Sequence, residues 1–248
     1  MRFDQPLQPG VLKRRYKRFL ADVALPDGHV LTCHCPNTGS MLGCATPESR
    51  VWLSRASNPR RKYAYTWEIV EVATGALVGI HTGRTNALVR EAIGTDVVPE
   101  LKGYRRVDAE VSVADAPMRA DFHLRKGAGK PDCFVEVKNV TAAVDAAGIA
   151  VFPDAVSERG RRHLEVMTWL VRETQKRAVT IFCAQRDDVT AIQPADRIDP
   201  AYGRALRAAH AAGVELIGLA ATVTPQGITV DRRVPVVLPT LNDNALNG

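Results

Sequence analysis

Residues 132–140 read Asp-Cys-Phe-Val-Glu-Val-Lys-Asn-Val, and they predict a short buried strand because β-branched and aromatic residues run through them. Side chains alternate between the two faces of a strand. Glu136 and Lys138 therefore lie on one face, and Val135 and Val137 lie on the other. The strand combines an apolar face with a face on which a carboxylate stands beside an amine.

A second short strand is predicted upstream, over residues 119–124. The connection between the two strands, residues 125–130, is polar and contains glycine. Two strands joined in this way favour an antiparallel hairpin. In such a hairpin Asp121 can lie near Glu136.

The set Asp121, Glu136 and Lys138 resembles the core of the PD-(D/E)xK nuclease fold. Two hard carboxylates, Asp121 and Glu136, can hold Mg²⁺, for which Mn²⁺ can substitute. Such a metal activates water and stabilises charge on phosphate, while a lysine can orient the nucleophile. The alternative is solvated charge on an exposed strand face. Ala120 stands where the motif's proline is expected.

Four further residues are candidates for auxiliary roles at this site. Glu91 lies on a predicted helix, over residues 85–93, and Glu110 lies on a predicted strand. Arg159 and His163 are four residues apart on a helix and so share a face, from which they can reach DNA phosphates. The alternative for all four is an ordinary surface position.

Beyond residue 140, helix and strand patterns alternate. The predicted elements are a helix capped by Ser157, a buried strand over 178–184, an alanine-rich helix over 200–212, a buried strand over 214–220 and a final hairpin turning at 225–227. This alternation favours an α/β sheet with flanking helices. We assign residues 85–240 to this nuclease-like mixed-sheet domain and expect a disordered tail over 241–248.

The first third of the chain has a different pattern. Five short strands are predicted, over 18–25, 29–35, 51–54, 65–72 and 76–81. They favour a small all-β barrel of the OB type over residues 1–84, and such barrels often bind nucleic acid. We expect Trp52 and Trp67 in the barrel core. Cys33 and Cys35 are expected to be buried side chains rather than metal ligands, because no second ligand pair completes a site.

The positive charge of the chain is concentrated in this barrel. The first 85 residues hold 12 Lys/Arg and 6 Asp/Glu, whereas the remainder holds 21 of each. A basic module beside a neutral one indicates that the first domain meets a polyanion. The alternative is a basic surface without a partner.

Candidate DNA contacts lie in two basic segments and one loop. The segments are Arg14-Arg15-Tyr16-Lys17-Arg18 and Arg60-Arg61-Lys62, and the loop offers Asn37 and Thr38. Cations can follow phosphates while aromatic rings stack on bases. Asn37 and Thr38 can donate hydrogen bonds to phosphate or simply shape the turn.

The composition also bears on location. The chain has no run of 18 apolar residues and begins with a polar segment that lacks a signal-peptide core. Its five cysteines are an odd number, for which reduced thiols are the default. We therefore expect a cytoplasmic protein that does not enter a membrane.

Several stretches together resemble the sugar fermentation stimulation protein family. They are Arg15-Tyr16-Lys17-Arg18-Phe19-Leu20-Ala21-Asp22-Val23, His34-Cys35-Pro36-Asn37-Thr38-Gly39, Gly43-Cys44-Ala45-Thr46-Pro47, Arg61-Lys62-Tyr63 with Thr66-Trp67-Glu68, Glu136-Val137-Lys138 with Val140-Thr141, and Phe152-Pro153-Asp154-Ala155-Val156 with Glu158-Arg159-Gly160 and His163-Leu164. The resemblance runs over about residues 5–238. It implies an OB-like first domain, a nuclease-like second domain, DNA binding without sequence specificity and a regulatory link to maltose metabolism.

Two main functions stay open at this point. One is a non-specific DNA-binding protein, and the other is a Mg²⁺-dependent DNA nuclease that uses Asp121, Glu136 and Lys138, the residues that the resemblance carries over. A carbohydrate- or metabolite-binding regulator is a third reading, since OB folds also bind sugars. The sequence has no apparent helix-turn-helix, which disfavours sequence-specific recognition. It does not give the oligomeric state.

Overall fold

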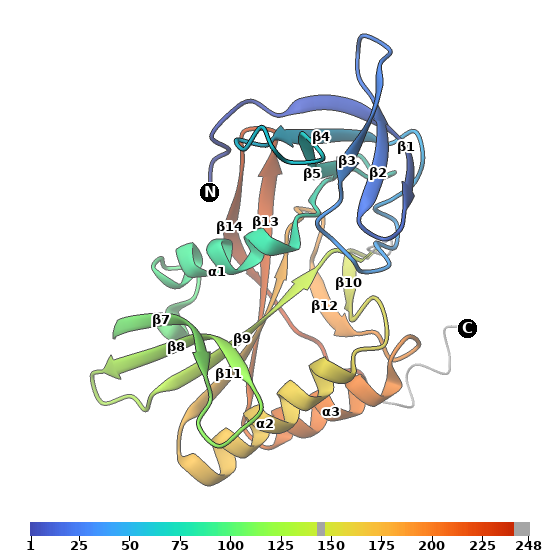
Figure 1. Ribbon diagram of the computed structural model, residues 1–248. Helices are drawn as coiled ribbons and strands as arrows, with labels where there is room; N and C mark the ends of the chain where they lie inside the picture. The colour runs from blue at the N-terminus through green and yellow to red at the C-terminus, as the bar shows by residue number, and fades with distance from the viewer. Residues whose placement is uncertain (143–146, 241–248) are drawn as a thin grey trace.

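The computed structural model describes residues 1–142 and 147–240. The predicted tail at 241–248 lies outside the described residues. Two six-stranded sheets dominate the rest: one forms an N-terminal barrel, and the other is covered by helices (Figure 1).

The barrel contains strands β1 to β6. Their bounds are β1 (Gln8–Tyr16), β2 (Leu20–Ala24), β3 (Val30–His34), β4 (Arg50–Arg55), β5 (Tyr65–Glu71) and β6 (Leu77–Gly79). The strand order is β3-β2-β1-β4-β5-β6, and a parallel pair between His34 and Thr66 joins β3 to β5. This pair closes β1 to β5 into the five-stranded barrel expected of an OB fold.

The identity of the five strands differs from the prediction. The first barrel strand, β1, was not anticipated, and β6 pairs with β5 outside the closed ring. Only Leu12 is buried along β1, so the strand shows no apolar alternation in the sequence. Lys17 and Arg18 have positive φ angles of 49° and 64°, which turn the chain inside the segment expected to begin a strand.

The aromatic residues of the barrel take different positions. Trp67 is fully buried in the barrel core and donates from Nε1 to the carbonyl of Ile69 at 2.9 Å, as expected. The expectation for Trp52 was wrong, because it packs into the core of the second domain. Phe19 is 46% exposed on the turn between β1 and β2. Cys33 and Cys35 both pack in the barrel core.

The second domain is a mixed sheet between helical layers, which confirms the predicted fold. Its strands are β7 (Tyr104–Ser112), β8 (Arg119–Gly127), β9 (Cys133–Val140), β11 (Arg177–Ala184), β13 (Glu215–Thr224) and β14 (Gly227–Val234), in the order β14-β13-β11-β9-β8-β7. The three central strands, β9, β11 and β13, are parallel, and the outer strands are antiparallel to their neighbours.

Three helices cover this sheet. Helix α1 (Thr85–Ile93) packs in one core with the barrel residue Trp52, whereas α2 (Glu158–Thr174) and α3 (Pro200–Ala211) lie side by side over the other face (Figure 1). Ser157 caps α2 by accepting a hydrogen bond from the Gly160 amide at 3.1 Å, as predicted. The short helices η1 (Thr82–Arg84) and η2 (Pro99–Leu101) complete the connections around α1.

A small parallel pair, β10 (Ile149–Phe152) and β12 (Ala191–Pro194), lies beside the main sheet and was not predicted. The domains meet closely at β6, where the Gly79 amide donates to the Gln185 carbonyl at 2.8 Å. A Cβ at Gly79 would stand 2.8 Å from the Ile228 side chain and 2.9 Å from that of Gln185, so a larger residue would require these side chains to shift.

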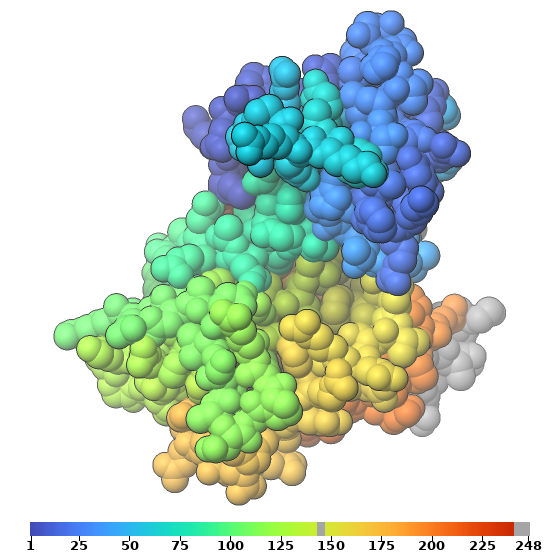
Figure 2. All heavy atoms as spheres, in the orientation of Figure 1, coloured from blue at the N-terminus to red at the C-terminus, as the bar shows by residue number. Residues whose placement is uncertain are grey.

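The first residues of the chain leave the barrel. Arg2 bridges to Gly227, and the Met1 amine donates to the Ile228 carbonyl at 2.9 Å. Residues 1–3 therefore lie against β14, although the sequence assigned them to the first domain. Figure 2 shows the barrel above the second domain, with a recess where the two surfaces meet.

Candidate functional site

The β8–β9 hairpin brings the two predicted carboxylates together. Phe122 pairs with Val135 in an antiparallel register, which confirms the hairpin. The residues one step away, Asp121 and Glu136, therefore face each other across the two strands. The Oδ2 atom of Asp121 accepts a hydrogen bond from the Val137 amide at 2.7 Å.

Glu136 is the buried centre of the site, with its side chain 6% exposed. Its Oε1 atom lies 2.6 Å from Lys138 Nζ and 2.6 Å from His163 Nδ1. Its Oε2 atom is buried and has no hydrogen-bond partner among residues 1–142 and 147–240. One oxygen of the carboxylate is thus held twice, and the other keeps unused acceptor capacity.

Asp121 is held by a residue that sequence reasoning missed. Asn86, on α1, donates from Nδ2 to Asp121 Oδ1 at 2.7 Å. The two residues are 35 positions apart in the chain. The only sequence signal was a polar side chain near the start of a predicted helix, and that signal does not identify its target.

The pKa values of the two carboxylates are shifted in opposite directions. Burial raises the pKa of Asp121, and the negative charge of Glu136 raises it further. Burial also pushes the pKa of Glu136 upward, but the hydrogen bond from His163 and the charge of Lys138 outweigh it, so the net shift is downward. The surroundings therefore favour the charged form of Glu136 and disfavour the charged form of Asp121.

Two buried hydroxyl groups accompany Glu136. Thr180 is its register partner on β11, and Tyr202 packs from α3 over the same face of the sheet. Within the described part of the chain, neither hydroxyl has a hydrogen-bond partner. Burial raises the pKa of Tyr202, and the nearby negative charge of Glu136 adds to this shift. The surroundings of Glu136 thus contain buried polar groups.

The structure separates the four auxiliary candidates into two groups. Glu91 forms an ion pair with the Met1 amine at 2.7 Å, and Glu110 lies 3.3 Å from Arg119 with its side chain 52% exposed. Neither carboxylate contacts Glu136 or Asp121, so the expectation that they join the site was wrong. His163 does reach Glu136, and Arg159 Nε donates to His163 Nε2 at 3.3 Å.

Part of the predicted DNA-binding segment instead supports a loop. Arg15 donates to the carbonyls of Arg18, Asn37 and Gly39 at 2.8–2.9 Å, and Arg18 donates to the Thr38 carbonyl at 2.9 Å. These contacts fix the loop over residues 36–41. The guanidinium of Arg15 is thereby engaged within the protein.

That loop contacts the second domain at Thr141 and Asp154. Asn37 is 3% exposed and donates to Thr141 at 3.3 Å, so its expected contact with phosphate is replaced by a contact between the domains. Ser40 donates to the carbonyl of Asp154 at 2.8 Å. A Cβ at Gly39 would lie 2.5 Å from the Asp154 carboxylate, which explains the glycine.

The remaining basic candidates lie at the barrel surface. Arg14 pairs with Asp22 at 2.7 Å and is 69% exposed, and Tyr16 donates to the same carboxylate at 3.1 Å. Lys17 and Thr38 are exposed at the loop tips.

The second basic segment is also exposed, and its contacts are local. Arg61 donates to Thr66 at 3.3 Å, Lys62 lies over the Tyr63 ring at 5.6 Å, and Arg60 is exposed.

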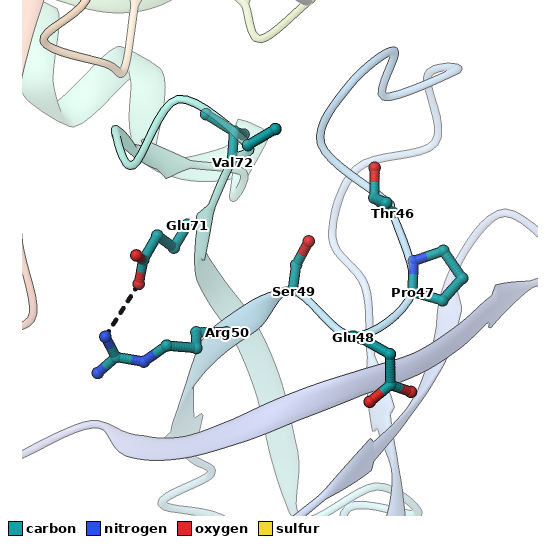
Figure 3. A pocket seen from close by; sticks show the side chains of 8 residues that line it. Thr46, Pro47, Glu48, Ser49, Arg50, Glu71 and Val72 are labelled. Atoms are coloured by element: carbon teal, nitrogen blue, oxygen red, sulfur yellow. Dashed lines mark hydrogen bonds and ion pairs between the residues drawn. The ribbon is translucent and has the colours of Figure 1, made fainter.

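A separate hollow lies on the outer side of the barrel, with a volume of about 290 Å³ (Figure 3). Thr46, Pro47 and Ser49 line it, and Arg50 pairs with Glu71 at 3.1 Å across its edge. The hollow shares no residue with the carboxylate site.

Comparison with known families gives two matches that together cover most of the chain. Residues 14–80 match the sugar fermentation stimulation protein (SfsA) N-terminal OB domain. Residues 83–227 match the sugar fermentation stimulation protein RE domain.

Curated relatives match over nearly their full lengths. A sugar fermentation stimulation protein homolog of Alkalilimnicola ehrlichii is 59% identical over 96% of this chain and 100% of the relative. A homolog of Pseudomonas aeruginosa PAO1 is 48% identical over 96% of this chain and 100% of the relative.

Among solved structures, that of Pyrococcus furiosus SfsA in complex with Ca²⁺ superposes with a TM-score of 0.82. It is 26% identical, over 96% of this chain and 98% of that chain. Within the described residues, no helix is long and apolar enough to cross a membrane.

Proposed function

Because this chain belongs to the sugar fermentation stimulation protein family, we propose that it binds DNA without sequence specificity and hydrolyses phosphodiester bonds with a divalent cation. The observation that carries this proposal is the pairing of Asp121 with a charged, buried Glu136 whose Oε2 atom has no partner among the described residues. A buried carboxylate oxygen without a partner needs an explanation, and the capacity to bind a cation is one.

The donor set fits Mg²⁺ or Mn²⁺. Asp121 and Glu136 would hold the ion, and a hard cation of this kind prefers one or two carboxylates with water completing its shell. When bound, the cation would supply charge neutralisation at phosphate and activation of a water molecule. A cation bound by these residues would also offset the repulsion from Glu136, which adds to burial in raising the pKa of Asp121.

Lys138 has a separate role in the proposed reaction. Lys138 holds Glu136 at 2.6 Å and stands on the same strand face, where its ammonium can shift toward a phosphate oxygen. The structure of the Pyrococcus furiosus relative is described as a complex with Ca²⁺, a hard cation of the same class, which supports a cation site in this chain.

The barrel would bind the DNA. Lys17 and Arg18 are exposed on the β1–β2 turn beside Phe19, which is 46% exposed, and Arg18 also contacts the loop that reaches Asp154. Cations beside an exposed ring suit a nucleic-acid backbone and its bases. If about six phosphates are contacted, the log–log slope of affinity against salt is roughly −5 on duplex DNA.

A second candidate is DNA binding without cleavage, in a regulatory role linked to maltose metabolism. The observation that favours it is that Lys138 is already paired with Glu136 at 2.6 Å, while Ala120 replaces the motif's proline. In this reading Lys138 serves only to hold Glu136. The regulatory link comes from the family resemblance alone.

One experiment separates the two candidates. Supercoiled plasmid is incubated with the protein in EDTA, Mg²⁺ or Mn²⁺, and nicking and retardation are both measured. The isosteric variant Glu136→Gln should bind plasmid normally and lose metal-dependent nicking, whereas the control Glu91→Gln should nick normally. Retardation without nicking in every condition would favour the second candidate, and nicking that persists in Glu136→Gln would refute the assigned site.

A further inference from the structure

Two side chains in the first two turns of α2 form a chain of contacts that ends at Glu136. His163 Nδ1 lies 2.6 Å from Glu136 Oε1, and Arg159 Nε lies 3.3 Å from His163 Nε2. His163 is 8% exposed, whereas Arg159 is exposed. The contacts form a chain from the surface through a buried imidazole to the carboxylate.

The hydrogen bonds give the two ring nitrogens of His163 separate roles. An arginine side chain can only donate, so His163 Nε2 accepts from Arg159. The other nitrogen, Nδ1, faces Glu136 and contacts Oε1.

Two groups hold the same oxygen of Glu136. Lys138 Nζ and His163 Nδ1 each lie 2.6 Å from Oε1. The carboxylate cannot rotate without breaking both contacts, so Oε2 stays the oxygen with free acceptor capacity.

We propose that His163 is a positioning residue that holds Glu136 in its metal-binding orientation, and that Arg159 acts through His163 by holding its ring at Nε2. This inference rests on the proposed metal-dependent function. It replaces the sequence-based expectation that both residues contact DNA phosphates. In other proteins, loss of a group that orients a metal ligand weakens metal binding by about 10- to 100-fold.

The test measures Mn²⁺ binding by calorimetry on the full chain without DNA. His163→Leu removes the donor and should weaken Mn²⁺ binding by about 10-fold or more. His163→Asn places an amide N–H near the Nδ1 position and should stay within a few-fold of the unsubstituted protein. Circular dichroism and thermal melting report whether each variant folds. If the Leu variant does not fold, the test is made with the Asn variant.

Arg159 is tested through a double-mutant cycle. Arg159→Met should weaken Mn²⁺ binding in the unsubstituted protein, by less than His163→Leu does. In the His163→Asn background it should have no effect, because asparagine lacks the Nε2 acceptor. Equal effects of Arg159→Met in both backgrounds would show that Arg159 acts independently of His163.

Failure of this inference can be distinguished from failure of the proposed function. Wild-type Mn²⁺ binding by a folded His163→Leu variant would overturn this inference and leave the proposed function intact. No Mn²⁺ binding by the unsubstituted protein would overturn the metal site itself, and this inference with it.

Discussion

Asn86 on α1 donates a hydrogen bond of 2.7 Å to Asp121 on β8. With the Val137 amide on the other oxygen, this contact satisfies both oxygens of Asp121 and opposes the upward shift of its pKa. Helix α1 directly follows the barrel in the chain. The contact therefore ties the connection between the domains to the geometry of the carboxylate pair.

Substitution of Asn86 should impair the site more than the fold. Asn86→Leu removes one hydrogen bond, which costs about 1 kcal/mol of stability, but it lets Asp121 rotate and raises its pKa further. We expect metal-dependent plasmid nicking to fall at least several-fold, as measured by initial rates beside urea unfolding. Glu91→Gln on the same helix serves as the control. Full nicking activity in Asn86→Leu would show that Asp121 needs no support from α1.

Phe19 should contribute to single-stranded DNA binding. Stacking of a base on an exposed ring is worth about 1–3 kcal/mol, so Phe19→Ala should weaken binding of a single-stranded oligonucleotide by that amount in fluorescence anisotropy. Val237→Ala is the matched control, because Val237 is 40% exposed and lies far along the chain. Equal effects of the two substitutions would argue against stacking on Phe19.

Asp22 should make the barrel sensitive to acid. Burial raises the pKa of its carboxyl, but hydrogen bonds from Thr32, Arg14 and Tyr16 outweigh this effect and lower it below the usual 3.8. Because the folded pKa is depressed, the stabilisation is present above pH 3.8 and is lost as pH falls through the lower folded value.

The free energy of unfolding, measured in urea at pH 5, 4 and about 3, should therefore fall more steeply in the wild type than in Asp22→Asn. Asp115→Asn, at an exposed position, should keep the wild-type slope. Parallel pH profiles for the wild type and Asp22→Asn would show that Asp22 does not cause the acid sensitivity.

Arg186 should be a major structural residue of the second domain. Its side chain is 2% exposed, contacts both oxygens of Asp188 at 2.6 and 2.8 Å and donates to the Ala142 carbonyl at 2.8 Å. Arg186→Met leaves these acceptors unpaired and should destabilise the protein by about 3–5 kcal/mol.

The exposed pair of Lys13 and Glu48 provides the contrast. Lys13→Met should change the free energy of unfolding by less than about 1 kcal/mol, since both side chains are well exposed. Chemical denaturation of the two variants would decide the point. A loss below about 1 kcal/mol for Arg186→Met would mean that water replaces the guanidinium.

Elements with strong local signals were predicted well. Helix α1 spans Thr85–Ile93, the predicted residues, and the N-cap at Ser157 is present. The hairpin of β8 and β9 follows from alternation and a short glycine-containing connection. By contrast, β1 was missed because only Leu12 is buried along it, and the small β10–β12 pair was missed because each strand has only four residues.

The candidate site was predictable only where it lies on one hairpin. Asp121, Glu136 and Lys138 share two adjacent strands, so strand alternation alone places them together. Glu91 and Glu110 have the same residue type as Glu136, yet they pair with Met1 and Arg119. Residue type therefore identified candidates but could not choose among them.

The sequence by itself determined the two domain types and the carboxylate pair, because alternation and short turns act over neighbouring residues. Only the tertiary structure decided that Asn86 holds Asp121, that His163 holds Glu136 and that Arg15 supports a loop rather than facing solvent. These contacts join residues 22 to 35 positions apart. Their geometry depends on how helices pack across a sheet, and no local pattern encodes that packing.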